Sequence, residues 1–300
     1  MEKWRVGLAA FLVILLAGLG AGQAWGAAAP DAAQPVEQWV GKVFVVLPLE
    51  RGKKAEGYAF TLEAPRPELF TAGGNIRADW LEGKRLEVVT VKKLPALKDG
   101  PPVNDYEIFF RIQGGGEGLT IKALGGQAKH LVPADDLAAA KKHFAAKVVF
   151  SKRLAIPAYQ EEPGTIRVKI NEPLTVEDVI AGIDADEPIW LVVSTADKRK
   201  GYIAIAYSLT NVQRGFWPTA KPWESVLFET DPRLLFAWDD QAWASINAGV
   251  VKDGMVPDQV RLAWGEPLSI VRLVGEETWF YPDKIVKFHP TTGLFLIQSR

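Results

Sequence analysis

The run Tyr106-Glu107-Ile108-Phe109-Phe110-Arg111-Ile112 is followed by Gly114-Gly115-Gly116-Glu117-Gly118 and then by Leu119-Thr120-Ile121-Lys122-Ala123-Leu124. The first run is rich in aromatic residues and isoleucine, and the second contains the β-branched Thr120 and Ile121; both residue classes favour strands. The glycines between them suit a tight hairpin turn. A phosphate-binding loop is disfavoured, because the GxGxxG and GxxxxGK[ST] spacings are absent and no helical pattern follows. The stretch therefore predicts two antiparallel strands.

Most of the chain after Trp39 has the same texture, with short apolar runs broken by glycine, proline and aspartate. This pattern is typical of a mainly β protein. Similar phrases of an aromatic, a small residue, a lysine and a β-branched run start at Trp39, Trp80 and Phe144, but their unequal spacing excludes a fixed-period solenoid. A helix is predicted over 131–146, with Pro133 at its start. We place a domain boundary there.

Composition narrows the function classes. The 300 residues carry 35 Lys+Arg and 36 Asp+Glu, a formal net charge of −1, which is too balanced for a protein that depends on nucleic acid. The chain has no cysteine, so disulfides, thiolate catalysis, cysteine-ligated metals and a lipid anchor on an N-terminal cysteine are all excluded.

The first residues have the order of a secretory signal peptide. Lys3 and Arg5 precede an uncharged apolar run over 6–19, and small residues follow it. We predict a signal peptide at 1–26 and a periplasmic or extracellular mature protein. The alternative is an uncleaved inner-membrane anchor formed by residues 6–29. In an oxidising compartment a chain without disulfides has to rely on its packed cores.

The middle of the chain, 144–212, is predicted to be a second small β-module. Residues 165–170 alternate as a half-buried strand does, whereas 174–182 fits either a capped helix or a strand. The runs 188–193 and 201–205, joined by a charged turn, resemble bacterial SH3-like modules. That resemblance implies a small barrel that binds cell-wall peptides or partner proteins. We expect Trp190 and Tyr202 to fill its core.

The C-terminal part is dense in aromatic residues, because six of the eleven tryptophans lie in the last 85 residues. Such density indicates either a small core of large side chains or a binding face. A helix is predicted from Asp239 to near Gly249, and a second from Pro257 to Gly265. Strand-like runs follow at 268–274, 278–281, 285–288 and 294–297, so this part is predicted to be an α+β sandwich.

Residues of this C-terminal part resemble the SmpA/OmlA (BamE-like) family of small outer-membrane assembly lipoproteins. The matching motif residues are Gly254, Met255, Gln259, Val260, Gly265, Pro267, Trp279 and Tyr281. The resemblance implies an ααβββ domain that recognises other envelope proteins. Two departures matter: Val256 replaces the usual hydroxyl N-cap, and the lipobox cysteine is missing, so the lipid tether does not carry over. We expect positive φ at Gly254 and Gly265, with Met255 in the core.

No pattern for catalysis or metal binding stands out. His130, His143 and His289 lie outside any HExxH motif, and no GxSxG or SxxK motif is present. Adjacent acid pairs diverge on a helix or a strand, and the acids at 184–187 lack the other ligand positions of a calcium loop. We therefore expect no cofactor, no metal and no enzymatic activity.

These observations predict a mainly β protein with one or two small SH3-like β-barrel modules and a C-terminal α+β domain. The expected units are a signal peptide at 1–26, a β-rich module at 36–130, an SH3-like module at 144–212, a Trp/Pro-rich connector at 213–238 and a BamE-like domain at 239–300. Whether the module at 36–130 is also SH3-like is left open. The boundaries follow the changes of texture along the chain.

The predicted function is recognition of proteins or cell wall in the envelope, with outer-membrane or envelope assembly as one role. The alternatives are an accessory or targeting part of a cell-wall-modifying enzyme, and a structural accessory without a ligand. Expected partners are envelope proteins or peptidoglycan peptides, with no nucleic acid or lipid anchor, and a membrane only if the leader is retained. The predicted binding residues are Trp217, Trp223, Tyr202, Lys198, Arg199 and Lys200. Alternatively, the two tryptophans plug the junction between modules.

Overall fold

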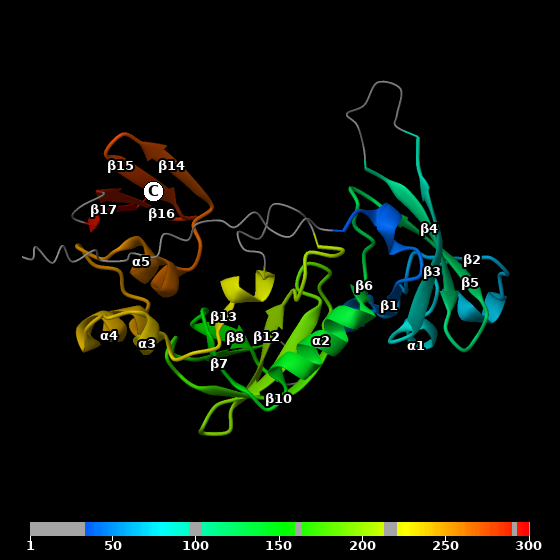
Figure 1. The fold of residues 1–300 in the computed structure, drawn as a ribbon, viewed down its shortest axis with the longest axis horizontal. Coiled ribbons are helices and arrows are strands. Elements are labelled where there is room, and N and C mark those ends of the chain that lie inside the picture. The colour runs from blue at the N-terminus through cyan, green and yellow to red at the C-terminus, as the bar shows by residue number, and fades with distance from the viewer. Residues whose placement is uncertain (1–33, 96–103, 160–163, 213–220, 290–292, 300) are drawn as a thin grey trace, which may run out of the picture.

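The computed structural model describes residues 34–95, 104–159, 164–212, 221–289 and 293–299. The predicted leader, 1–26, and Trp217 lie outside these ranges. The described strands form three main antiparallel sheets and one two-stranded ribbon. The three sheets follow one another along the long axis of the molecule, the C-terminal sheet on the left and the first sheet on the right (Figure 1). The prediction of a mainly β protein is confirmed.

The first sheet has the strand order β2-β5-β4-β3-β1-β6. Its strands are β1 Val43–Val46, β2 Thr61–Leu62, β3 Arg85–Lys93, β4 Tyr106–Ile112, β5 Gly118–Ala123 and β6 Leu131–Pro133. Short helices connect them: η1 Val36–Trp39, η2 Arg51–Lys53, η3 Pro67–Leu69 and α1 Ala78–Leu81. The predicted hairpin is the antiparallel pair of β4 and β5. Alternate residues of β4 are buried, as expected for a strand that covers a core on one face.

The second sheet has the order β12-β11-β10-β7-β13. Its strands are β7 Val148–Ser151, β10 Leu174–Ala181, β11 Ile189–Ser194, β12 Lys200–Ile205 and β13 Leu227–Phe228, and the ribbon of β8 Ala155–Pro157 and β9 Thr165–Arg167 lies beside it. The ambiguous segment is thus the strand β10, bulged between Val176 and Asp178. A closed barrel is absent from the described strands, because the sheet ends at β12 and β13. The expected SH3-like barrel is therefore not confirmed: these strands form an open sheet.

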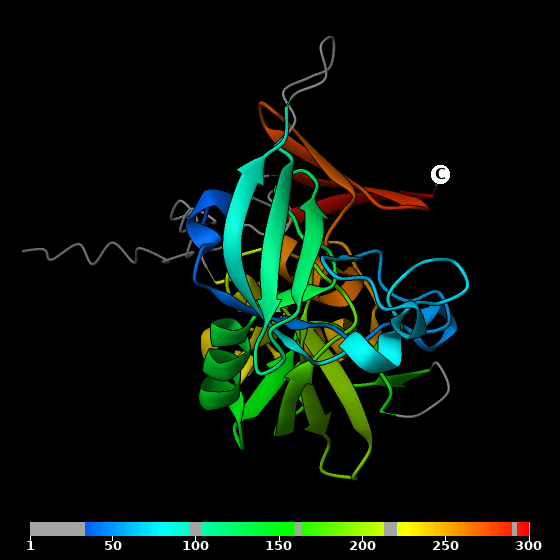
Figure 2. The ribbon, with the colours of Figure 1, turned by 90° about the vertical axis from the view of Figure 1, so that its right-hand side faces the viewer.

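Helix α2, Ala134–Phe144, is shorter than predicted because its expected first residues form β6. Its Phe144 belongs to the core of the second sheet, and so do Val45 and Val132 from the first sheet. At the predicted domain boundary, the first and second sheets therefore share one hydrophobic core. Asn211 reinforces it: its Nδ2 donates to the carbonyl of Leu131 at 2.7 Å. In the view from the side of the first sheet, α2 lies beside the strands of the second sheet (Figure 2).

The predicted connector, 213–238, is more than a linker. Its described part contains η4 Pro222–Ser225, β13 and helix α3 Pro232–Leu235. Strand β13 pairs with β7, so it belongs to the second sheet. Phe236 and Trp238 pack against a further core that Trp243 shares with Phe150 of the second sheet. The C-terminal helices therefore rest on the second sheet.

Helices α4 Asp240–Ala248 and α5 Pro257–Trp264 confirm the two predicted helices. The Asp239 carboxylate accepts from the Ala242 amide at 2.7 Å, which caps α4. Gly254 and Gly265 have the expected positive φ, 80° and 84°. At the start of α5 the Val256 side chain caps nothing, although the Gln259 amide oxygen accepts from the Val256 backbone N–H at 3.0 Å.

The C-terminal sheet is a meander of four strands, β14 Ser269–Leu273, β15 Glu276–Phe280, β16 Lys284–His289 and β17 Gly293–Ser299. The four predicted strand-like runs are confirmed, whereas the family resemblance implied three strands. Met255 and Trp279 lie in the core between the helices and the sheet. Within the described ranges, no helix is both long enough and apolar enough to cross a membrane.

Candidate functional site

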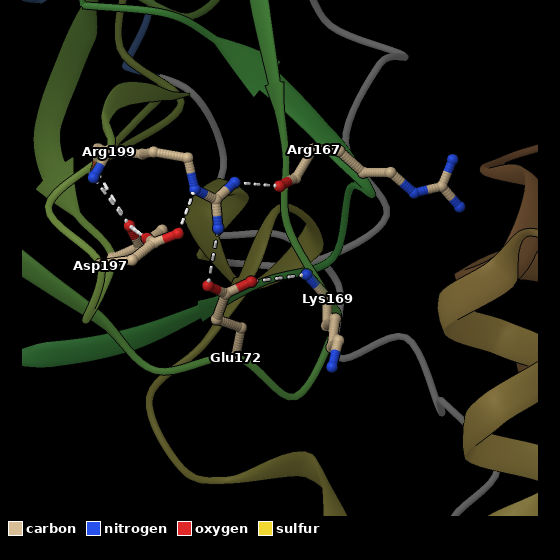
Figure 3. A network of polar contacts seen from close by, with 6 residues as sticks. Arg167, Lys169, Glu172, Asp197 and Arg199 are labelled. Carbon is tan, nitrogen blue, oxygen red and sulfur yellow. Dashed lines mark hydrogen bonds and ion pairs between the residues drawn. The ribbon is translucent and has the colours of Figure 1, made fainter.

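The Lys198-Arg199-Lys200 turn was predicted to offer cations to a ligand, but Arg199 already bonds to other residues of this chain (Figure 3). Its Nε donates to Asp197 at 2.7 Å, and its two terminal nitrogens reach the Arg167 carbonyl at 2.6 Å and Glu172 at 3.3 Å. Hydrogen bonds from Arg199 and Thr195 lower the pKa of Asp197 to about 2. Arg199 therefore fastens the turn to the segment between β9 and β10.

The other two lysines of the turn differ. Lys200 forms an ion pair of 2.5 Å with Glu177, and that contact raises the pKa of Lys200. Lys198 lies in the left-handed region with φ of 70° and is exposed. Within the described part of the chain its ammonium makes no ion pair, although its charge helps to lower the pKa of Glu177 after the larger contributions of Lys200 and Ser194. Of the three predicted cations, only Lys198 is open to a ligand.

A hollow of about 470 Å³ lies next to this network and is lined by Lys169, Asn171, Glu172, Pro173, Arg199 and Arg233. Its two arginines are already paired, Arg199 with Glu172 and Arg233 with Asp231. On the same segment, the Ile170 amide donates to the Asn247 side chain of α4 at 2.9 Å. The network therefore joins the second sheet to the C-terminal helices.

The structure places Trp190 and Tyr202 on the outer face of the second sheet, which corrects their predicted place in a barrel core. Side chains alternate along a strand, and Leu191 and Ile203 are the neighbours that enter the core. The Trp190 and Tyr202 ring centroids lie 4.7 Å apart, and Tyr159 adds a third ring at 5.2 Å from Tyr202. We call these three residues the aromatic face.

Two glycines allow this arrangement. A Cβ on Gly182 would lie 2.3 Å from the Trp190 ring, so only glycine leaves room for the indole. A Cβ on Gly201 would lie 2.8 Å from the Pro157 carbonyl oxygen, so glycine lets the chain after β8 approach β12. The Tyr159 amide then donates to the Lys200 carbonyl at 3.0 Å. This bond sets Tyr159 beside Tyr202.

The polar groups of the aromatic face are largely unused. Within the described ranges, the phenol hydroxyls of Tyr159 and Tyr202 have no hydrogen-bond partner, and the buried Trp190 Nε1 has none either. Burial, with a contribution from Tyr159, raises the pKa of Tyr202, so its hydroxyl stays protonated at neutral pH. Tyr159 is 51% exposed. The face therefore offers ring surfaces and two hydroxyls without a partner among the described residues, and Lys198 lies in the turn that leads into β12.

Trp223 does not line an accessible surface, which corrects the prediction for this residue. Its side chain is 5% exposed, and its ring lies 5.3 Å from Phe144 and 5.4 Å from His143. It belongs to the core under α2, because η4 folds back onto the second sheet. This is the alternative in which a tryptophan plugs a junction. Trp217, the other predicted binding tryptophan, lies outside the described residues.

His143 pairs with an acid. His143 Nε2 lies 2.7 Å from Glu229, which Lys147 also contacts at 3.3 Å. Burial raises the pKa of Glu229, but the bonds from His143 and Lys147 outweigh it and lower this pKa overall. The imidazole packs against aromatic rings, among them Tyr207. Across the described residues, no three His, Asp or Glu side chains come close enough together to hold a metal ion.

Comparison with known proteins adds no relative: no family model, no curated protein and no solved structure matches the chain. The two family resemblances therefore stay predictions.

Tyr202 was among the predicted binding residues, and Tyr159 was not. Nothing local couples Tyr159 to Tyr202, because 43 residues separate them and β8 brings them together. Gly182, directly after the run 174–181, and Gly201, directly before Tyr202, are the signal that points to close approach there.

Proposed function

We propose that this protein is exported to the cell envelope and acts by recognition, binding a cell-wall peptide or an envelope protein through the aromatic face and catalysing no reaction. The observation that carries the proposal is the aromatic face itself, in which three rings lie side by side. Its two phenol hydroxyls have no hydrogen-bond partner within the described residues. Tyrosine and tryptophan dominate binding surfaces because each buries a large apolar area and offers a polar tip at low entropic cost.

The surroundings of the aromatic face favour a peptide-like ligand with a carboxylate. Lys198, in the turn before β12, is exposed and makes no ion pair within the described residues, whereas the exposed Lys200 is paired with Glu177. An extended peptide can stack on the rings, hydrogen bond to the hydroxyls and place an acidic group near Lys198. Peptidoglycan stem peptides and acidic segments of envelope proteins both have this chemistry. The resemblances to SH3-like modules and to the BamE-like family suggest the same class of function, and a closed barrel is not required.

Binding to purified peptidoglycan sacculi and to an envelope extract tests the proposal. The predicted mature protein, from Ala27 onward, is compared with the Tyr159→Ala/Tyr202→Ala variant. The matched control is Phe295→Ala, which removes a similarly exposed aromatic side chain, 46% against 51% for Tyr159, from the C-terminal sheet. We expect the double variant to lose about tenfold or more in affinity and the control to bind as wild type does. Equal binding by all three proteins, or no binding by the wild type in either assay, would refute the proposal.

Export rests on the predicted leader at 1–26 and has its own test. Cell fractionation followed by sequencing of the mature N-terminus is expected to give a soluble envelope protein that begins close to Ala27. A membrane-bound chain that retains Met1 would establish the alternative, an inner-membrane anchor formed by residues 6–29. Recognition by the aromatic face is compatible with both outcomes, so the two tests are independent.

The second candidate, an accessory part of a cell-wall-modifying enzyme, is favoured by the distance of 2.7 Å between His143 and Glu229. A general base oriented by an acid has this spacing. However, His143 packs on the Trp223 ring and Glu229 also binds Lys147, which is the arrangement of a structural contact. We expect His143→Ala to leave the muropeptide products of sacculi unchanged. A change in those products would favour the enzyme.

A further inference from the structure

Four exposed apolar side chains gather around strand β14. Leu268, Val271, Leu273 and Val274 are 71%, 45%, 66% and 107% exposed. They flank or form the first strand of the C-terminal sheet and the tip of its first hairpin. Single exposed apolar residues are common on protein surfaces, but a cluster of this kind marks an interaction surface.

Among the described strands β14 pairs with β15 alone, so it is an open edge of its sheet. The opposite edge, β17, is shielded where it starts: the Leu294 amide donates to the Met255 carbonyl, and its carbonyl accepts from Gly254, both at 2.9 Å. Within the described ranges no such cover reaches β14 from outside. Proteins normally protect a free edge with charges, proline or a bulge. Here the only charge in the strand is Arg272, which is paired with Glu277 at 3.3 Å.

The residue pattern of β14 fits a second copy of itself. In an antiparallel pair centred on Val271, that valine lies opposite its equivalent, and Ser269 lies opposite Leu273. Ile270 lies opposite Arg272, so the two arginines are not directly opposite each other. Pairing of β14 with β17 of another copy is obstructed at Leu294 and would build an open chain of molecules. Pairing of β14 with itself closes after two copies.

We propose that the β14 strands of two copies pair antiparallel about Val271 and form a symmetric dimer with one continuous sheet, four strands from each copy. The dimer covers the exposed Val271 and Leu273 side chains and satisfies the free backbone groups of the edge. It also displays two aromatic faces on one particle, so a ligand that repeats along a surface binds with increased avidity.

Disulfide trapping tests this pairing, because the native chain contains no cysteine. Residues directly opposite in an antiparallel pair have Cα atoms about 4.5 to 5.5 Å apart, which is within the range that a disulfide spans. Mild oxidation is therefore expected to convert Val271→Cys to a covalent dimer. The matched control, Leu296→Cys on the other edge strand, is similarly exposed, 38% against 45% for Val271, and is expected to stay monomeric.

Light scattering over a concentration series supplies the second measurement. The wild type is expected to have the mass of a dimer. Val271→Lys is expected to be a monomer, because it brings two like charges face to face at the symmetry axis. If this variant fails to fold by circular dichroism, the cysteine pair still decides. A wild type that is monomeric at every concentration, or equal trapping of the two cysteine variants, would overturn the proposal. A β14 edge that binds a different partner would give the first of these results.

Discussion

The outer face of the second sheet and the segment around Trp223 use aromatic residues in opposite ways. Trp190 and Tyr202, expected in a core, lie on the surface, whereas Trp223, expected on the surface, is buried under α2. The residue types are the same in both regions. What differs is whether another segment of the chain covers the face on which the side chain lies.

Strand β11 shows why the sequence alone could not separate the two cases. Its run Ile189-Trp190-Leu191-Val192-Val193 is apolar on both faces, so no alternation reveals which face is buried. Helix α2 packs on the face of Leu191, and the other face is left to Trp190. Removing an aromatic side chain around Trp223 is therefore expected to lower the free energy of unfolding much more than removing one from the aromatic face.

The largest effect is expected for Trp223→Ala, which empties a core site between Phe144 and His143. We expect a loss of about 3 to 5 kcal/mol in the free energy of unfolding. Tyr159→Ala, which removes an exposed ring, is expected to change it by no more than about 0.5 kcal/mol. Urea unfolding of the two variants beside wild type measures both values. Similar losses in the two variants would break the comparison.

Lys152 gives the next largest effect, and it contrasts with Lys200 at the surface. Lys152 donates to the Glu224 carbonyl at 2.5 Å under the same folded-back segment, and burial lowers its pKa to about 8. Since folding disfavours the charged lysine, the penalty is fully present below pH 8. It fades as the pH rises toward the ordinary lysine value of about 10.4.

Replacing this side chain isolates its contribution. The unfolding free energy of wild type is expected to rise relative to that of Lys152→Met, by about 2 to 3 kcal/mol between pH 8 and about pH 10.4. Urea unfolding of both proteins at intervals over this range gives the difference. At the surface, Lys200→Met serves as the control, because the pKa of Lys200 is raised by Glu177 and should give no such rise. A flat difference for Lys152 would show that its ammonium is well solvated.

The smallest of these effects concerns the support of the aromatic face. Gly182→Ala places a methyl group 2.3 Å from the Trp190 ring, so the ring has to move. We expect a loss of about 1 to 3 kcal/mol in unfolding free energy, together with weaker ligand binding. Gly73→Ala is the control, since its nearest contact is 3.8 Å away and its φ is not positive. If the two alanine variants behave alike, the indole does not depend on Gly182.

Much of the fold was predictable where local forces decide. The hairpin of β4 and β5, the capped helix α4 and the positive φ of Gly254 and Gly265 follow from turn chemistry and capping, which act within a few residues. Residues 174–182 could not be assigned, because local signals favoured both a helix cap and a strand. Pairing of β10 with β7 and β11 decided for the strand.

The candidate site was predictable only in part. Tyr202 was named from its run, but its neighbour Tyr159 comes from a segment that reaches it only through the β8 ribbon. Arg199 and Lys200 were expected to be free, yet their acids, Glu172 and Glu177, stand 27 and 23 residues away in the sequence. Which charges are neutralised depends on strand pairing, which a single strand does not reveal.

By itself the amino-acid sequence determined a mainly β chain, its turns and caps, its balanced charge and its lack of cysteine. Those properties depend on residue types and on interactions between near neighbours. The tertiary structure decided which aromatic residues are buried, which cations are paired and which sheet edge stays open. Burial and ion pairing depend on the segments that come to lie on each face, and for Trp223 that segment is α2, about 80 residues earlier in the chain.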